Sequence, residues 1–469
     1  MAHPEKLSTA KKWLYALGQL GWSLGSYGAL NLVNYFYNPP AAAAAGTAGA
    51  VAAPMFPLFI GSAAALGIVA STGRLFDAIT DPLIAGWSDR STHAKGRRLS
   101  FMRWAALPFV LFSLLIFLPP SAIGVINVIW LWVMSFIFYF AMTAYVTPFF
   151  ALLSELGHDP EERLQLSTMI SITWALGFMI GSQVYALQGF FEAFLNPLGA
   201  FRAALAIFGG ISLILMYLPV IAIDERRYCL QTSSSEGSFE AVKNALGNPD
   251  FRAFVISDLA YWLGLTFVQT GIAYYVVVLL GLPKEQASLM LLTLFLASFL
   301  FYVPVGIIAA KTGKKRLLVA AFVLFIVADI LMLFWGRLPL PPLTQGLSVM
   351  VLAALPIAIF GILPNAIVAD VAEDDGRQTG NHKAAVFFGA RTLMQKVGIA
   401  ITLLIFPVLS QVGSPDSRVN AIGVRLTLIV SAIALAAGML FFLRYRETEI
   451  LERLRKSPDG EPNPATPTL

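Results

Sequence analysis

Charged residues are scarce in this chain of 469 residues. They make up 13% of it and hydrophobic residues 57%, against roughly 25% and 45–50% in soluble globular domains. No Asp, Glu, Lys or Arg occurs between Lys12 and Arg74, or between Arg103 and Glu155, so each interval can supply two apolar spans of about 20 residues. These runs are continuously apolar, whereas a membrane β-barrel alternates polarity within segments of about 10 residues. The sequence therefore predicts an all-α polytopic membrane protein and argues against a cytosolic enzyme.

Other absences narrow the chemistry. The single cysteine, Cys229, can form neither an intramolecular disulfide nor a cysteine metal cluster. There is no Walker-type phosphate-binding sequence, and the four histidines fall outside the predicted spans, so neither ATP hydrolysis nor a histidine proton relay is indicated. The spans contain no nucleophile–base or metal-ligand constellation, so no enzyme activity and no cofactor are predicted. The net charge of +5 lies in a few loops, which argues against nucleic acid as a partner.

The apolar runs divide into twelve expected membrane spans. Their approximate bounds are 13–37, 55–86, 99–119, 124–155, 164–190, 201–223, 251–280, 286–310, 316–336, 346–371, 384–411 and 421–443. The longest internal polar stretch separates the sixth span from the seventh and suits a linker. We therefore predict four regions, which are an N-terminal six-helix bundle (1–223), a cytoplasmic linker (224–250), a C-terminal six-helix bundle (251–446) and a disordered cytoplasmic tail (447–469).

Lys and Arg indicate the orientation. They gather in the loops between spans two and three and between spans eight and nine, and at both ends of the apolar region. Cytoplasmic loops of membrane proteins carry the excess of these residues. Both termini are therefore predicted to be cytoplasmic, in a protein integral to the lipid bilayer of the plasma (inner) membrane.

Two acids in the second span are the strongest functional signal. An ionisable side chain inside a span costs about 2.5–3.5 kcal/mol on insertion scales, so it usually faces a cavity or a partner. Asp77 and Asp81 lie one helical turn apart, on one helix face. Their repulsion is relieved if a cation binds between them or if one is protonated, which is the chemistry of an ion-coupling site. Lys396 in span eleven is the expected counter-charge from the second half, and Thr143 in span four could add a hydroxyl oxygen.

A purely structural arrangement is the alternative for the same residues. Asp77 would then pair with Arg74 or Lys396, and Asp81 would cap a local break at Pro82. Thr143 would bond its own helix backbone, as buried threonines commonly do. The residues alone leave both possibilities open.

A loop signal recurs in the two halves. Gly86-Trp-Ser-Asp89-Arg90 and then Gly96-Arg97-Arg98 follow the second span, and a related basic segment follows the eighth. The first copy resembles the signature loop of the major facilitator superfamily. That resemblance implies twelve helices in two pseudo-symmetric bundles and a cytoplasmic gate formed by Asp89, Arg90, Arg97 and Arg98. A basic loop of this kind is also what the positive-inside bias alone produces.

A second resemblance is more specific. Arg74-Leu-Phe-Asp77-Ala-Ile-Thr80-Asp81-Pro82, together with Met394-Gln-Lys396-Val-Gly398, is similar to helices two and eleven of the glycoside–pentoside–hexuronide:cation symporters, which include the melibiose permeases. The resemblance implies a monomeric symporter. Its coupling ion, Na⁺ or H⁺, would bind at Asp77, Asp81, Thr80 and Thr143, with the two acids as metal ligands if sodium is coupled.

The expected substrate site departs from the melibiose permeases. Those proteins hold sugar hydroxyls with carboxylates in helices one and four, where this chain has Ser23 and Val146. The remaining substrate candidates are mostly aromatic, namely Trp22, Phe150, Trp174 and Tyr261, with Lys396. In lacking both of these acids, the chain also resembles the lysolipid:sodium symporters of this family. A sugar-like solute and a lysophospholipid therefore both stay open, as does packing alone for each aromatic residue.

A different class of function is a transporter-like sensor or a passive lipid mover. In such a protein the acidic pair would stabilise the fold, and ligand binding would be indifferent to Na⁺ and pH.

Overall fold

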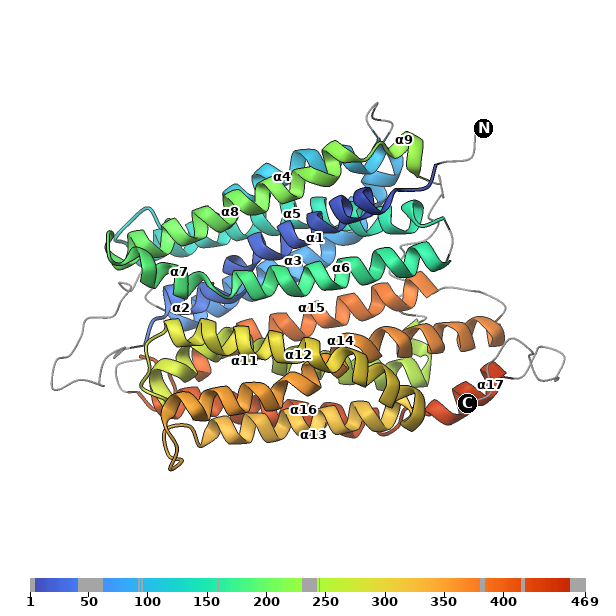
Figure 1. The fold of residues 1–469 in the computed structure, drawn as a ribbon. Coiled ribbons are helices and arrows are strands. Elements are labelled where there is room, and N and C mark those ends of the chain that lie inside the picture. The colour runs from blue at the N-terminus through green and yellow to red at the C-terminus, as the bar shows by residue number, and fades with distance from the viewer. Residues whose placement is uncertain are drawn as a thin grey trace.

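Every regular element in the described part of the chain is a helix (Figure 1). The computed structural model describes residues 5–40, 62–91, 93, 96–158, 160–229, 243, 245–379, 384–414 and 418–455. The first half contains α1 (Thr9–Tyr27), the π-helical turn η1 (Gly28–Leu32), α2 (Val33–Tyr37), α3 (Ala63–Arg90), α4 (Arg97–Leu115), α5 (Gly124–Leu156), α6 (Pro160–Gly181), α7 (Val184–Phe191) and α8 (Pro197–Ala222). The second half contains α11 (Pro249–Tyr274), the π-helical turn η2 (Tyr275–Leu279), α12 (Glu285–Thr312), α13 (Lys314–Leu333), α14 (Pro342–Thr379), α15 (Ala384–Leu409) and α16 (Ala421–Phe442).

The long helices run side by side in two bundles, the first half above the second in Figure 1. In the first half α1 packs on α6 and α8, and α3 packs on α5; in the second, α11 packs on α15 and α16, and α12 on α14. The pairs α3–α15 and α7–α12 join the halves along a seam. The predicted all-α fold of two pseudo-symmetric bundles is confirmed. Below, "terminal end" means the end with the start of α1, and "loop end" the end with α2 and α7.

Eleven helices in the described ranges are long and apolar enough to cross a membrane. The remaining predicted span, 13–37, corresponds to α1, η1 and α2, which continue from Thr9 to Tyr37. This stretch is less apolar because it contains glycines together with Ser23, Asn31 and Asn34, all three of which are buried. Its polar groups therefore lie inside the protein rather than against lipid, as expected for small and polar residues at helix contacts in membranes.

The helix starts follow from capping residues. Asn196, Asn248 and Asn420 each accept a backbone N–H from the first turn of the helix that they precede. Proline takes the first position of two of these helices, where a missing N–H has no cost. The predicted fifth span, 164–190, is divided at residues 182–183 into α6 and α7.

A carboxylate holds the start of one helix in each half at the terminal end. α4 follows Gly96, whose φ of 104° favours glycine. Glu225, in the short helix α9 (Glu225–Tyr228), accepts the backbone N–H groups of Arg97, Arg98 and Leu99 at 3.0–3.3 Å. A negative charge at the N–H end of a helix is stabilising.

Glu447 does the same for α13. It lies at the start of α17 (Glu447–Arg455) and accepts the backbone N–H groups of Lys314 and Lys315 at 2.6 and 2.9 Å. Arg453 of α17 also bonds Asp374 of α14 at 2.8 Å. The predicted disorder from residue 447 on is wrong for residues 447–455, which form α17. The hydrogen bonds of Glu447 hold α17 to α13, and the ion pair of Arg453 with Asp374 holds it to α14. Residues 456–469 lie outside the described part.

The seam is closely packed at Gly67 of α3. A Cβ atom on Gly67 would lie 2.3 Å from the carbonyl oxygen of Leu404 on α15. We expect Gly67→Ala to push α3 from α15 and to raise solvent access at the loop end. The measurement is the rate of maleimide labelling of a cysteine placed at Ser410, which is buried there. Burial raises the pKa of the Cys229 thiol, so the natural cysteine reacts slowly.

Gly210→Ala is the matched control, because a Cβ atom there meets nothing within 4 Å. Equal labelling rates in the two alanine variants would show that the added Cβ atom of Gly67→Ala does not separate α3 from α15.

Candidate functional site

Asp77 lies at the centre of a buried network on α3. Its Oδ2 atom accepts Arg74 Nη1 at 2.8 Å and Lys396 Nζ at 2.9 Å, and its Oδ1 atom accepts the Thr143 hydroxyl at 2.5 Å. Thr80 donates to Thr143 at 3.2 Å. Three of the four residues predicted for the cation site are therefore joined by hydrogen bonds, from Thr80 to Thr143 and from Thr143 to Asp77.

Asp81, the fourth, shares Lys396 with Asp77. Lys396 Nζ lies 2.5 Å from Asp81 Oδ2, and Thr147 donates to Asp81 Oδ1 at 3.3 Å. Asp77 is 1% exposed, whereas the Asp81 side chain is 32% exposed. The ammonium of Lys396 therefore bridges the two carboxylates, and Asp81 is the more exposed of the two.

Helix geometry explains the arrangement. Thr143 and Thr147 are four residues apart on α5, as Asp77 and Asp81 are on α3, so one hydroxyl faces each acid along the α3–α5 contact. Pro82 follows Asp81 and cannot donate the backbone hydrogen bond of an unbroken helix. Thr147 was not among the predicted site residues, although its spacing from Thr143 repeats that of the acids.

A second ionic network lies on the other face of α15. Arg391 donates to both carboxylate oxygens of Asp258 on α11, at 2.9 and 3.2 Å, and to Asn365 of α14 at 2.6 Å. Gln395 donates to Asp258 at 3.1 Å. Asp258 is buried, ten residues into α11, so it does not cap a helix end. Because Gln395 precedes Lys396, α15 joins this network to the acidic pair of α3.

The predicted substrate residues are brought together only in part. Trp22 and Phe150 meet edge to face at 6.5 Å between ring centroids, and Val146 lies beside Thr147 on α5. Ser23 is buried in the close α1–α6 packing, where a Cβ atom on Gly177 would meet it.

The two other aromatic candidates have ring partners within their own half. Trp174 lies against Phe178 at 5.1 Å on α6. Tyr261 stacks on Phe360 at 3.7 Å inside the second half.

Comparison with known proteins shows the family of the chain. The family model described as MFS/sugar transport protein, where MFS is the major facilitator superfamily, matches residues 14–448. The chain belongs to this family. It is a membrane transporter and not an enzyme, and the resemblance to glycoside–pentoside–hexuronide:cation symporters is confirmed.

The names of proteins similar to this transporter indicate different solutes. It is 25% identical over 291 residues to the isoprimeverose transporter of Lactiplantibacillus pentosus, a match that spans 61% of this chain and 60% of that protein. It is 22% identical over 440 residues to sodium-dependent lysophosphatidylcholine symporter 1 of Gallus gallus, covering 83% of this chain and 80% of the relative. The crystal structure of a D-xylose-proton symporter has the same fold, with a TM-score of 0.67 at 14% identity over 94% of this chain and 98% of that one.

The gate predicted for the transporter is described in part. Arg97 forms an ion pair with Glu155 of α5, and Arg98 does so at 2.8 Å. These partners belong to the first half. Arg90 is exposed at the end of α3, and the side chain of Asp89 lies outside the described part of the structure.

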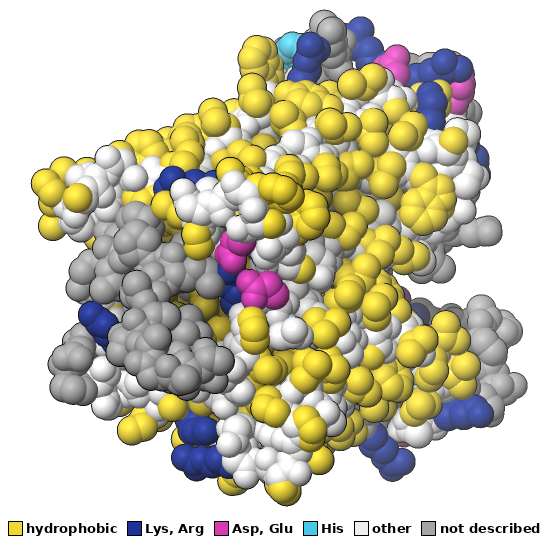
Figure 2. Space-filling view, turned by 60° about the vertical axis from the view of Figure 1, so that its left-hand side comes forward, with side chains coloured by type: hydrophobic (Ala, Val, Ile, Leu, Met, Phe, Trp, Pro, Cys, Tyr) yellow, Lys and Arg dark blue, Asp and Glu magenta, His cyan; other side chains and the backbone are white. Residues whose placement is uncertain are grey.

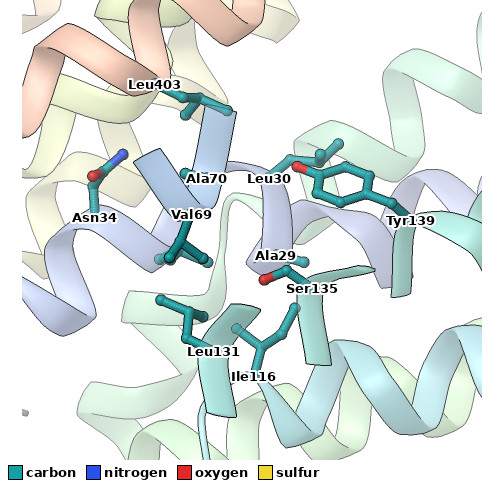
Figure 3. A pocket seen from close by; sticks show the side chains of 11 residues that line it. Ala29, Leu30, Asn34, Val69, Ala70, Ile116, Leu131, Ser135, Tyr139 and Leu403 are labelled. Carbon is teal, nitrogen blue, oxygen red and sulfur yellow. The ribbon is translucent and has the colours of Figure 1, made fainter. Parts of the chain in front are cut away.

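A small cavity lies beside Val69 and Ala70 of α3 (Figure 3). These two residues precede Asp77 in the helix. Val69 of α3, Ala29 of η1, and Leu131 and Ser135 of α5 close around it, and its volume is about 10 Å³. A cavity of this size holds at most one water molecule. This cavity is therefore too small to hold a transported solute.

The hydroxyl of Thr143 gives a first test of the predicted cation site. Thr143→Val keeps the side-chain shape but removes the donor to Asp77 and one oxygen near the acids. We expect about tenfold weaker cation affinity with little change in maximal transport, because one polar ligand is lost and both charges remain. The measurement is solute uptake as a function of cation concentration.

Thr173→Val is its control, since Thr173 bonds only the backbone of α6 in the described contacts. An unchanged cation affinity in Thr143→Val would exclude this hydroxyl from the site.

Proposed function

We propose that the transporter is a symporter in which Na⁺ or H⁺ binding at Asp77 and Asp81 drives uptake of a solute between the two halves. The observation that carries this proposal is the position of Lys396, whose ammonium lies between both carboxylates. A cation from solution can replace that ammonium, because it offsets the same two negative charges.

The residues around the pair suit either ion. Sodium is held by oxygen atoms, and the two carboxylates offer four, with the Thr143 and Thr80 hydroxyls next to them. A proton would instead neutralise one acid and remove the repulsion. In both cases Lys396 is released from α3, so the ionic link between α3 and α15 is broken when the cation binds.

This link connects cation binding to movement of the halves. At the loop end the seam is held by Lys284, which bonds Glu192 at 2.8 Å, and by Gln411, which bonds Asn38 at 2.8 Å. Acidic and basic side chains meet between the halves in Figure 2, and a notch parts the halves at its right-hand edge. Alternating access by rocking of the two bundles would break these contacts and close the opposite end.

We further propose the orientation and the gate. The terminal end faces the cytoplasm of a plasma (inner) membrane, and Asp89, Arg90, Arg97 and Arg98 act there when that end closes. The protein works as a monomer, with the linker 224–250 between its two bundles.

The proposed solute is sugar-like or glycoside-like, which the family model supports. A lysophospholipid is the second candidate. It is favoured by Ser23 and Val146, which stand where acids hold sugar in the melibiose permeases, and by the apolar wall of Trp22 and Phe150.

The test is uptake into proteoliposomes with an imposed Na⁺ or proton gradient, using a panel of glycosides and lysophospholipids. We expect accumulation with one gradient and none when that gradient is collapsed, together with cation-dependent thermal stabilisation by the same solute. Binding that ignores both Na⁺ and pH, without accumulation, would support a sensor or a passive lipid mover instead.

A further inference from the structure

A pocket lies at the terminal end of the second bundle, on the right in Figure 1, where the start of α11 meets the end of α16. Its volume is about 170 Å³, against about 30 Å³ for one water molecule in the liquid. All of its lining residues belong to the second half. The apolar part of the wall contains Ala253, Ile256 and Phe441, and the basic part contains Arg252, Arg444 and Arg446.

Two of the three arginines face this pocket without an acidic partner. Arg446 bonds Asp250 at 2.9 and 3.2 Å and forms an ion pair with Glu449 at 3.2 Å. Arg252 and Arg444 are exposed, and within the described ranges neither guanidinium has a hydrogen-bond or ion-pair partner. The guanidinium of Arg444 lies over the Phe441 ring, 5.1 Å from its centroid. The pocket therefore has two positive charges that no carboxylate of the described chain offsets.

The first bundle shows that the fold does not need this charge. Glu225 and Glu447 occupy corresponding places, since each begins a short helix and accepts N–H groups at the start of α4 or α13. Three residues before Glu225 stands Ala222, where the second half has Arg444 before Glu447. Both carboxylates hold their helices in spite of this difference. Arg444 is therefore not required for the turn that follows the last span of a bundle.

The pocket lies where the apolar surface of two spans ends. α11 and α16 are both long and apolar enough to cross a membrane, and the pocket is formed by residues 249–256 and 441–446 at their adjoining ends. Leu440 and Leu443, on either side of Phe441, are 61% and 48% exposed. Exposed apolar side chains and two free guanidinium groups thus adjoin at one end of the spans. Basic pockets between membrane helices at this level bind the headgroups of anionic lipids.

We propose that this pocket binds the headgroup of an anionic phospholipid from the leaflet at the terminal end. Arg252 and Arg444 would donate to the phosphodiester oxygens, because a guanidinium fork matches phosphate geometry. An acyl chain would lie along Phe441 and the exposed leucines of α16, which a free phosphate ion could not use. Since Arg252 belongs to α11 and Arg444 follows α16, the bound lipid would hold these helices together. Such binding is independent of the transported solute and of the coupling ion.

Native mass spectrometry and thermal unfolding of the purified transporter in a neutral detergent provide the test. Phosphatidylglycerol and phosphatidylcholine with the same acyl chains are compared, so that only the headgroup differs, and inorganic phosphate supplies the anion without chains. We expect phosphatidylglycerol to be retained and to raise the unfolding temperature, because a ligand of the folded state stabilises it. Phosphatidylcholine and inorganic phosphate should do neither at the same concentration.

Variants of the two free arginines locate the binding. Arg252→Gln and Arg444→Gln should each raise the phosphatidylglycerol concentration needed for the same stabilisation by about fivefold, and together by about 25-fold. The matched control is Arg103→Gln with Arg316→Gln, which removes two exposed arginines from α4 and α13 at the same end of the molecule. This control should bind the lipid like the parent protein. Size-exclusion profiles check that each variant folds, and the two single variants keep the test if the double variant does not.

Three results would overturn the proposal. Equal losses in the pocket and control variants would show that the lipid follows the general surface charge. Equal retention of the two lipids would show that the headgroup charge is not recognised. Stabilisation by inorganic phosphate at the concentration at which phosphatidylglycerol acts would indicate a site for a free anion instead.

Discussion

Asp77→Asn is expected to abolish cation-driven accumulation of the solute. Its carboxylate accepts Arg74, Lys396 and Thr143, so it is the acid that most groups of the site share. Without its charge a cation gains attraction from Asp81 alone, in competition with Lys396. A loss of about 100-fold in cation-dependent uptake is expected, at the upper end of coupling between two sites. Asp81→Asn should have the same effect, because a cation would then be attracted by Asp77 alone, again in competition with Lys396.

Asp329→Asn is the matched control for this prediction. Asp329 is also a buried acid within a span, yet it bonds Ser431 inside the second half and not the seam. Uptake in proteoliposomes and size-exclusion profiles of the three variants are compared. Undiminished accumulation in Asp77→Asn would move the cation site elsewhere. Equal losses in Asp329→Asn would show that any buried acid is needed for a working fold.

The acidic pair and its lysine could be predicted from the sequence because charges within spans are rare. Two acids one turn apart share a face by helix geometry, and Lys396 was among very few candidates to offset them. The prediction needed no knowledge of how helices pack. The structural alternative weighed for Asp77, pairing with Arg74 and Lys396, also describes contacts that are present. The ion-coupling interpretation requires that a cation from solution displace Lys396 from the two acids, whereas the structural interpretation requires that the ion pairs stay intact.

The Asp258–Arg391 pair could not be predicted in the same way. Its members are 133 residues apart and meet only because α11 packs on α15. Asp258 lies within the expected span 251–280, but a single acid in a span does not indicate which residue pairs with it. Asn365 and Gln395 gave no signal, since an amide in a span costs less than a charge and stands out less.

The aromatic candidates show another limit of the sequence. In the interior of a bundle a helix is buried on several faces, so an aromatic ring can face a cavity or a neighbouring helix with the same spacing. Trp22 and Phe150 contact each other across the first half, whereas Tyr261 stacks on Phe360 in the second. Whether Tyr261 faces a cavity or a neighbouring helix depends on how α11 packs against its neighbours, which the spacing of residues does not show.

Lys396→Met is expected to change cation binding in the opposite direction from the aspartate variants. The ammonium now lies 2.9 and 2.5 Å from the two carboxylates, where the cation is proposed to bind. Removing it leaves two close negative charges that only Arg74 offsets, so a cation should bind about tenfold more tightly. Transport should nevertheless be lost, because the link that cation binding must break between α3 and α15 no longer exists.

The two effects are measured on the same protein, with cation affinity taken from thermal stabilisation against Na⁺ concentration and pH, and transport from uptake. Lys396→Arg serves as the control, since it keeps the charge and should keep weak cation binding. If Lys396→Met bound the cation more weakly than the parent protein, the lysine would assist the cation rather than compete with it. In that case cation and ammonium would occupy the acidic pair together, and cation binding would not release α15 from α3.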